Sequence, residues 1–249
     1  MLIHHSMPTP TVVSVVIPTY DERENLPRIA AAVLGHEGYR LIIVDDSSPD
    51  GTGALADELA ARSNGRLRVL HRTGPRGFGR SCLEGLAQAM AEPADVVCQM
   101  DADFSHDPDE LPRLAEATRT HDLVIGSRYV PGGLVANWPL HRLAVSTVAN
   151  WYVRVTLGLP VRDCTAGFRC WRRDALARMP LWQIESNGYA FQIEMAWEAA
   201  RRGFRIAELP IHFVERQRGR SKMSWGIVFE AVGLPWRLRR RARQDAKTS

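Results

Sequence analysis

Short apolar runs that each end in polar residues are the feature that most constrains how this chain can fold. Three of them lie in the first half, at "VVSVVIPTY" (12–20), "RLIIVDDSSPDG" (40–51) and "ADVVCQMDAD" (94–103). They are continuous and rich in β-branched residues rather than alternating, which is typical of strands buried on both faces. Two more strands are predicted at 66–72 and 122–129.

Helix-forming stretches lie between these runs, at 22–35, 51–63 and 79–91. The first has a proline near its start and a glycine at its end, which are ordinary start and stop signals for a helix. Strand and helix therefore alternate through residue 129. This order predicts the α/β class, as a three-layer sandwich with a mostly parallel central sheet.

The polar residues that follow the strands are expected to meet. In open α/β sheets the ligand binds beyond the carboxyl ends of the strands. Polar clusters follow four of the predicted strands, at 18–22, 45–46, 101–103 and 127–128. One shared crevice is the simplest interpretation of the four clusters.

The pattern changes after about residue 130. We predict an amphipathic helix within 137–161, an irregular aromatic-rich region through 186–204, a strand at 205–214 and a cationic loop at 215–224. No internal repeat or long linker is present in the sequence. The predicted organisation is an N-terminal extension at 1–11, one catalytic domain at 12–225 and an amphipathic, basic tail at 226–249.

Asp101 and Asp103 are the residues most indicative of chemistry. Residues two apart in a strand point to the same side, so the pair can present two carboxylates to one point. Like charges held close together require a cation or a shared proton. Few oxygen ligands at one site suit Mg²⁺ or Mn²⁺ completed by phosphates and water. The alternative is a helix start, which accounts well for Asp107, Asp109 and Glu110 but not for carboxylates that directly end a buried strand.

The other polar clusters leave two interpretations open. Residues 45–53 form either a plain turn-rich connection or a site where Asp45 and Asp46 accept hydrogen bonds from hydroxyl or base N–H groups. The loop at 72–81 is either a phosphate cradle or a mobile basic loop, since the chain lacks the glycine patterns of dinucleotide and P-loop sites. Cationic side chains suited to phosphate follow later, at Arg128, Arg142, Arg216, Arg218, Arg220 and Lys222; for Arg218 and Arg220 a solvated surface is equally consistent.

Charge and cysteine content bear on the cellular compartment. The net charge is +4, and "RLRRRARQDAK" (237–247) carries much of the excess, which would favour an anionic membrane surface. The four cysteines have no metal-site spacing, so reduced thiols are expected. We find neither a signal peptide nor an apolar run long enough to span a bilayer. We therefore expect a cytoplasmic protein, peripheral on the cytoplasmic face of the membrane, with no nucleic-acid partner.

Six motifs in order resemble those of a known family. The motifs are "VVIPTYDERENL", "IIVDDSSPDGTG", "QMDADFSHDPDEL", "VIGSRYVPGG", "DCTAGFRCW" and "ERQRGRSKMS". They are similar to the motifs of family 2 glycosyltransferases with the GT-A (Rossmann-like) fold. Within that family they are similar to the dolichol-phosphate or polyprenol-phosphate mannose synthases of the soluble catalytic type. The resemblance covers nearly all of residues 12–225. It implies an inverting transfer of mannose from GDP-mannose to a polyprenyl monophosphate, with Mg²⁺ or Mn²⁺ as cofactor.

The resemblance also implies roles for individual residues. It places Asp101, Asp103 and Arg128 at the catalytic centre, with Asp101 and Asp103 holding the metal. Ser105 stands at the third metal-side position, where family members often have glutamine; a serine hydroxyl is a shorter and weaker ligand, so water could take its place. The implied donor contacts are Pro18, Tyr20, Glu22, Val44, Asp46, Ala102, Arg128, Arg216 and Lys222, and the implied contacts of the lipid phosphate are Arg128, Arg142 and Ser146.

Two competing functions follow from the same residues. The first is a transferase of the same fold that uses another donor, such as UDP-glucose, with the same kind of acceptor. The second is a non-catalytic subunit that binds a nucleotide sugar. A lipid acceptor requires an apolar approach to the site, and the segment at 226–249, with apolar residues, two tryptophans nearby and a basic end, suits a helix at the membrane interface; the alternative is a helix that packs on the core. A separate membrane-anchoring subunit is a further expected partner.

Overall fold

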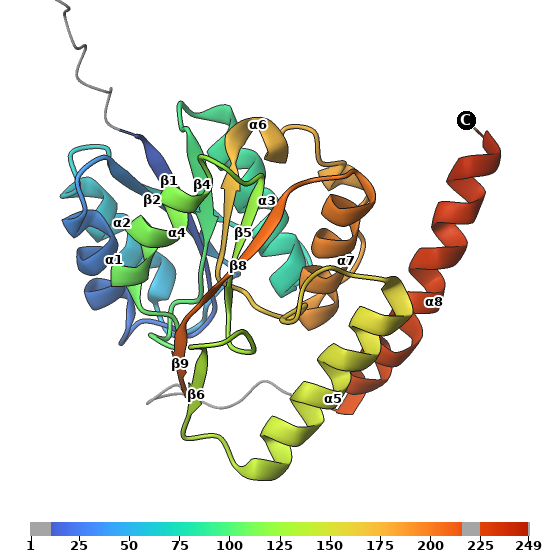
Figure 1. Cartoon of the computed structure of the whole chain (residues 1–249). Helices are drawn as coiled ribbons and strands as arrows, with labels where there is room; N and C mark the ends of the chain where they lie inside the picture. Colours follow the sequence, from blue (N-terminus) through green and yellow to red (C-terminus); the bar gives the residue numbers. More distant parts are fainter. Residues whose placement is uncertain (1–10, 216–224, 249) are drawn as a thin grey trace, which may run out of the picture.

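The computed structural model of the chain describes residues 11–215 and 225–248. A seven-stranded sheet in the order β3-β2-β1-β4-β7-β5-β8 forms the centre of the molecule (Figure 1). Its strands are β1 (Val13–Thr19), β2 (Tyr39–Asp45), β3 (Leu67–His71), β4 (Val96–Gln99), β5 (Leu123–Ser127), β7 (Arg169–Arg172) and β8 (Ile206–Pro210). Neighbouring strands run parallel except for β7, which is antiparallel to both β4 and β5. The predicted mostly parallel α/β sheet is confirmed.

Helices cover both faces of the sheet and make it the middle of three layers. In Figure 1, α1 (Leu26–Gly35), α2 (Thr52–Ala61) and α4 (Leu111–Ala117) lie on one side, whereas α3 (Phe78–Ala91) and α7 (Gly188–Arg201) lie on the other. Each side has its own apolar core: Leu26 and Ile29 of α1 pack with Val15, while Leu86 of α3 and Phe191 of α7 belong to the opposite cluster. The strands are therefore buried on both faces, as their continuous apolar runs predict.

Close packing of α3 against the sheet depends on one glycine. A Cβ atom at Gly85 would lie 2.4 Å from Val16 Cγ1 and 2.8 Å from Val44 Cγ2. No side chain fits at that separation, so the helix lies directly on β1 and β2. This contact fixes the middle of α3 against the two strands.

Three elements in the second half differ from the prediction. The region 186–204, predicted as irregular, contains the helix α7, in which residues 190–199 are all buried. The strand predicted at 205–214 is two strands, β8 and β9 (His212–Val214), and β9 pairs with β6 (Leu134–Ala136) in a separate parallel sheet. The strand β7 was not predicted. The short elements are η1 (Pro108–Glu110), α6 (Arg173–Leu176) and η2 (Leu181–Gln183).

Two long helices, α5 (Leu140–Leu157) and α8 (Trp225–Thr248), cross each other beside this core (Figure 1). The segment predicted as a tail is thus largely the helix α8. Its Leu234 and Leu238 are buried, and Arg241 forms ion pairs with the buried carboxylates of Glu194 and Glu198 on α7. The described part of α8 therefore packs onto the domain through both apolar and charged contacts.

Candidate functional site

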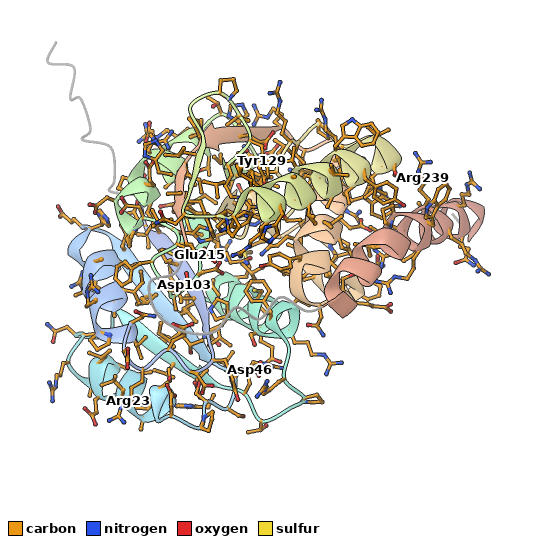
Figure 2. The ribbon with its side chains drawn as sticks, turned by 90° about the horizontal axis from the view of Figure 1, so that it is seen from below. Arg23, Asp46, Asp103, Tyr129, Glu215 and Arg239 are labelled. Atoms are coloured by element: carbon orange, nitrogen blue, oxygen red, sulfur yellow. The ribbon has the colours of Figure 1, made fainter. Side chains whose placement is uncertain are left out.

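A cavity of about 500 Å³ opens at the carboxyl ends of β1, β2, β4 and β5. These four strands run in the same direction, so their ends meet at one edge of the sheet, as predicted. The predicted site residues that line the cavity are Pro18, Tyr20, Glu22, Asp46, Asp101, Ala102, Asp103, Ser105, Arg128 and Arg142. In Figure 2, Asp103 and Glu215 lie close to the middle of the molecule and Asp46 lies below them, whereas Arg239 lies far out on α8.

The carboxylates of Asp101 and Asp103 stand at the centre of the cavity wall. Asp103 is buried, and its Oδ1 accepts hydrogen bonds from the backbone N–H of Ser105 (3.1 Å) and from Ser105 Oγ (2.6 Å). The Asp101 side chain is 33% exposed, and its backbone N–H donates to His106 Nδ1 at 3.2 Å. Ser105 thus orients Asp103 within the cavity.

The loop that carries this pair is held in an uncommon conformation. Phe104 has a φ of 58°, in the left-handed region that bulky residues rarely adopt. Such a residue costs on the order of 1–3 kcal/mol and persists only where its surroundings enforce it. Here the turn brings Ser105 back onto Asp103, while the guanidinium of Arg28 lies 4.8 Å from the Phe104 ring. The strained turn at Phe104 therefore places Ser105 where it can orient the carboxylate of Asp103.

His106 holds the backbone of Asp101 in place through a hydrogen bond to its ring. Its ring is buried against Phe168 and Phe213, with centroid distances of 5.1 Å and 5.6 Å. This burial lowers the pKa of His106, which favours the neutral ring whose Nδ1 accepts the Asp101 N–H. The position of Asp101 therefore depends on an aromatic cluster as well as on the strand that precedes it.

Two hard carboxylates on one wall fit a small divalent cation. Among residues 11–215 and 225–248, no three His, Cys, Asp or Glu side chains converge as a metal shell. Mg²⁺ and similar ions are commonly held by one or two carboxylates, with phosphate oxygens and waters as the remaining ligands. The donor set is therefore compatible with Mg²⁺ or Mn²⁺ that shares its ligands with a bound diphosphate.

Asp46 is the organising residue at the β2 end of the cavity. It forms an ion pair with the buried Arg72, and its Oδ2 accepts the backbone N–H of Gly77 at 2.8 Å. The loop at 72–81 is thereby fixed against β2. It also brings the Arg76 guanidinium to 3.8 Å from the centroid of the Tyr20 ring. The loop forms one wall of the cavity, to which it contributes Arg76, and its use as a phosphate cradle stays a prediction.

Arg128 lies at the end of β5 and is bound tightly by Asp163. Its Nε and Nη2 each lie 2.7 Å from a different carboxylate oxygen of Asp163, and Nη2 also donates to Thr165 Oγ1 at 2.8 Å. Burial alone would raise the pKa of Asp163, but the charge and hydrogen bonds of Arg128 lower it. The pair keeps Arg128 charged and oriented at the cavity.

A second buried arginine holds the loop that carries Asp163. Arg169 is 1% exposed, and its guanidinium donates to the carbonyl oxygens of Ala166 (2.9 Å) and Cys164 (3.1 Å). Burial lowers the pKa of Arg169 to about 10, so it remains a cation at neutral pH. The hydrogen bonds from Arg169 therefore fix the segment 163–168, and with it the position of Asp163 beside Arg128.

Arg142 faces the cavity from the first turn of α5. It forms an ion pair with Glu215, and its guanidinium lies 4.1 Å from the centroid of the Trp138 ring. Ser146, one turn further along α5, accepts a hydrogen bond from Tyr129 Oη at 2.7 Å and is not among the residues that line the cavity. Val44 is also away from the cavity, fully buried in β2. Arg216 and Lys222 lie outside the described residues.

Several residues of the site had no role in the sequence prediction. This group consists of Arg72, His106, Trp138, Asp163, Asn187 and Gln192. For Asp163 a signal was present, because it begins the motif "DCTAGFRCW". For Gln192 there was none, since it lies in the region predicted as irregular.

Comparison with known proteins gives a consistent family assignment. The sequence model described as "Glycosyl transferase family 2" matches residues 14–180. The polyprenol monophosphomannose synthase of Mycolicibacterium smegmatis is 49% identical over 222 residues, which cover 88% of this chain and 83% of that protein. The undecaprenyl-phosphate mannosyltransferase of Micrococcus luteus is 50% identical over 221 residues, covering 87% and 89% of the two chains. The dolichol-phosphate mannosyltransferase of Pyrococcus furiosus is 35% identical, covering 91% of this chain and 63% of that protein.

Solved structures agree on the fold. Glucosyl-3-phosphoglycerate synthase from Mycobacterium tuberculosis, in complex with Mg²⁺ and UDP, superposes with a TM-score of 0.64 over 90% of this chain and 78% of that chain, at 20% identity. The same enzyme with Mn²⁺, UDP and glucosyl-3-phosphoglycerate gives a TM-score of 0.63 over 89% and 76%. At this identity the likeness concerns the architecture alone, which is the predicted GT-A arrangement.

Proposed function

The chain belongs to glycosyl transferase family 2, and from this premise we propose that it transfers mannose from GDP-mannose to a polyprenyl monophosphate with inversion at the anomeric carbon. One observation carries the proposal. The carboxylates of Asp101 and Asp103 and the guanidinium groups of Arg128 and Arg142 line the same cavity. Carboxylates suit the metal of a nucleotide diphosphate, and guanidinium groups suit a second phosphate.

On the donor side, we propose that Tyr20, Glu22 and Asp46 contact the nucleoside. Glu22 accepts a hydrogen bond from Asn25 Nδ2 at 2.8 Å, so its position is fixed from the start of α1. Pro18 and Ala102 line the same cavity. A divalent cation held by Asp101 and Asp103 would neutralise the charge that develops on the departing diphosphate. Arg216 and Lys222, outside the described residues, are proposed as further donor-phosphate contacts.

On the acceptor side, the residues match a nucleophile that needs no base. A phosphate monoester has a second pKa of about 6, so at neutral pH it is already largely dianionic. One of its oxygens forms the new bond to the anomeric carbon while the bond to the donor diphosphate breaks, and the electron pair leaves with the diphosphate. We propose that Arg128 and Arg142 orient this phosphate. Ser146 would join them only if it released Tyr129.

A transferase for a hydroxyl acceptor is the second candidate, because Glu215 lines the cavity and is a carboxylate. A hydroxyl acceptor requires a general base. Glu215, however, is ion-paired with Arg142, so its carboxylate is already engaged by a guanidinium group. The phosphate acceptor therefore accounts better for the residues present, and it also agrees with the names of the relatives in which a lipid phosphate receives mannose.

A panel of donors crossed with acceptors tests the proposal. GDP-mannose, GDP-glucose, UDP-glucose and UDP-mannose would each be incubated with polyprenyl phosphate, with polyprenol and with a soluble sugar. We expect mannose transfer from GDP-mannose to polyprenyl phosphate only. Turnover with UDP-glucose would favour the other donor, turnover with polyprenol would favour the hydroxyl acceptor, and tight GDP binding without any turnover would favour a binding subunit.

The outer face of α5 suggests how a lipid acceptor is reached. Four apolar side chains on this face recur at helical spacing, and each is more than half exposed: Leu140, Val148, Trp151 and Val155. Arg142, on the first turn of the same helix, lines the cavity. None of the described helices is both long enough and apolar enough to cross a bilayer. We propose that this apolar face of α5 rests on the membrane and places the phosphate of an embedded polyprenyl chain near Arg142.

Charge placed on this face is expected to weaken membrane association. Val148→Asp and Trp151→Asp should each reduce sedimentation with liposomes by roughly tenfold, because a buried apolar side chain contributes about 1.5–3 kcal/mol. Trp182→Asp is the matched control, since Trp182 is 84% exposed and lies outside α5. Equal sedimentation of all three variants and the wild type would contradict this role of α5.

A further inference from the structure

Gln192 is a buried polar side chain without a partner. It is 1% exposed, and neither Oε1 nor Nε2 forms a hydrogen bond with any described residue. It also lines the cavity that contains Asp101, Asp103 and Arg128. Buried polar groups in folded proteins are nearly always satisfied, so an orphaned amide at a cavity wall needs an explanation. A ligand that occupies the cavity would supply the missing hydrogen bonds.

The helix that carries Gln192 is firmly positioned. Asn187, which precedes α7, accepts the backbone N–H of Gly79 through Oδ1 at 3.1 Å. A Cβ atom at Gly79 would lie 2.5 Å from the carbonyl oxygen of Ser186, so the amino ends of α3 and α7 are in direct contact. The backbone N–H of Ser186 in turn donates to Glu194 Oε2 at 3.0 Å. Gln192 is thus held on a pre-organised wall.

Gln192 reaches the cavity from a different element than the residues proposed to contact the nucleoside. Tyr20 and Asp46 follow β1 and β2, whereas Gln192 lies on α7. Gln192 shares its helix face with Gly188 and Tyr189, one turn earlier, and all three line the cavity. The helix packs on the sheet face shared with α3, and Asp101 and Asp103 line the same cavity as Gln192. A sugar linked to a diphosphate at these carboxylates would lie within that cavity.

The chemistry of the Gln192 amide limits which group of a ligand it can bind. A glutamine side chain is uncharged and offers one acceptor and two donors. Phosphate oxygens are better matched by the nearby arginines, whereas a sugar hydroxyl both donates and accepts. On the basis of the proposed function, we propose that Gln192 binds a hydroxyl group of the transferred hexose and contributes to the choice of sugar. A site built to hydrogen-bond a hydroxyl group strongly rejects an analogue that lacks it.

Binding of GDP and GDP-mannose to the full chain, measured by calorimetry, tests this role. The variant is Gln192→Met, which keeps the size and removes the amide, and the control is Gln88→Met, on α3, whose Nε2 bonds to Glu92. We expect the Gln192 variant to bind GDP like the wild type but to bind GDP-mannose roughly tenfold more weakly, the loss of one or two hydrogen bonds. Its melting temperature should be unchanged or higher, because an unsatisfied buried group is removed; a structural role would lower it.

Deoxy analogues of the mannosyl group identify the hydroxyl. The wild type should bind one monodeoxy GDP-mannose more weakly, and Gln192→Met should show no further loss with that analogue. Gln192→Asn, which retracts the amide by one methylene, is a second variant with the same expected loss in sugar binding. Wild-type affinity of either Gln192 variant for GDP-mannose, with an unchanged deoxy profile, would overturn the inference while leaving the proposed function intact. A wild type that does not bind GDP-mannose at all would overturn both.

Discussion

Replacement of Asp101 or Asp103 by alanine is expected to reduce mannose transfer by about 1,000-fold or more. The two carboxylates are the anionic groups on the cavity wall that Ser105 and His106 hold in place. Loss of either would remove a ligand of the cation that stabilises the leaving diphosphate, and such electrostatic contributions are typically worth 100- to 1,000-fold or more in rate. The measurement is the rate of transfer from labelled GDP-mannose at saturating polyprenyl phosphate.

Asp109→Ala is the matched control for this experiment. Asp109 belongs to the same acidic stretch, but its side chain is 85% exposed and its backbone N–H is capped by Asp107. It belongs to the helix start predicted from the sequence and should retain near wild-type turnover. Near wild-type turnover of both Asp101→Ala and Asp103→Ala would contradict the assignment of the metal site.

Asp163→Asn is expected to lower the free energy of unfolding by about 3–5 kcal/mol at neutral pH. The substitution keeps the shape of the side chain but leaves the buried Arg128 without its counter-ion, and breaking a buried ion pair on one side has a cost of this size. Transfer activity should also fall, since Arg128 loses the partner that orients it. Denaturant titration of both proteins at pH 7 gives the difference directly. Asp174→Asn, at an exposed position on α6, serves as the control.

The same pair predicts a dependence on pH. Arg128 lowers the pKa of Asp163 in the folded chain, so the unfolded chain binds this proton more readily. The stabilisation is therefore fully present above the unfolded pKa of about 3.9 and is lost as the pH falls through the lower folded value. The difference between the wild type and Asp163→Asn should be constant near neutral pH and shrink in strong acid. A constant difference throughout, or none at pH 7, would contradict this origin.

The first half of the fold was predictable because its sequence and its burial agree. Strands β1, β2 and β4 are continuous apolar runs and are buried on both faces. In contrast, β7 has arginine at both ends, and Arg169 at its start is buried through contacts with backbone carbonyls that the sequence does not show. The helix α7 is buried on nearly all sides and so lacks the one-sided periodicity by which helices are found.

The site was predictable where its residues are close in the sequence. Asp101 and Asp103 lie in the loop that directly follows β4, which ends at Gln99 rather than at Asp103 as predicted, and the parallel sheet brings other strand ends beside this loop. Partners that come from distant segments were not predictable: Arg72 for Asp46, Asp163 for Arg128 and Glu215 for Arg142. Pairs of this kind depend on how the elements pack, whereas spacing along the chain reports only local geometry.

For the proposed membrane-contacting surface, the structure points to a different helix from the sequence. The sequence favoured the segment 226–249 as the interfacial helix. In the described part of that segment, Leu234 and Leu238 face the core, while the exposed Trp236 donates a hydrogen bond to Tyr152 of α5 at 3.2 Å. The helix α5 packs against α8, and among the described residues its Val148 and Trp151 stay exposed on an apolar face.

Transfer of labelled mannose into an organic-soluble product is the measurement that tests the central claim most directly. The purified chain would be incubated with GDP-[¹⁴C]mannose, Mg²⁺ and either polyprenyl phosphate or the same polyprenol without its phosphate. Our account predicts label in the organic phase with polyprenyl phosphate, none with polyprenol, and a product with the anomeric configuration inverted. Label that transfers equally to polyprenol, or a product with retained configuration, would contradict it.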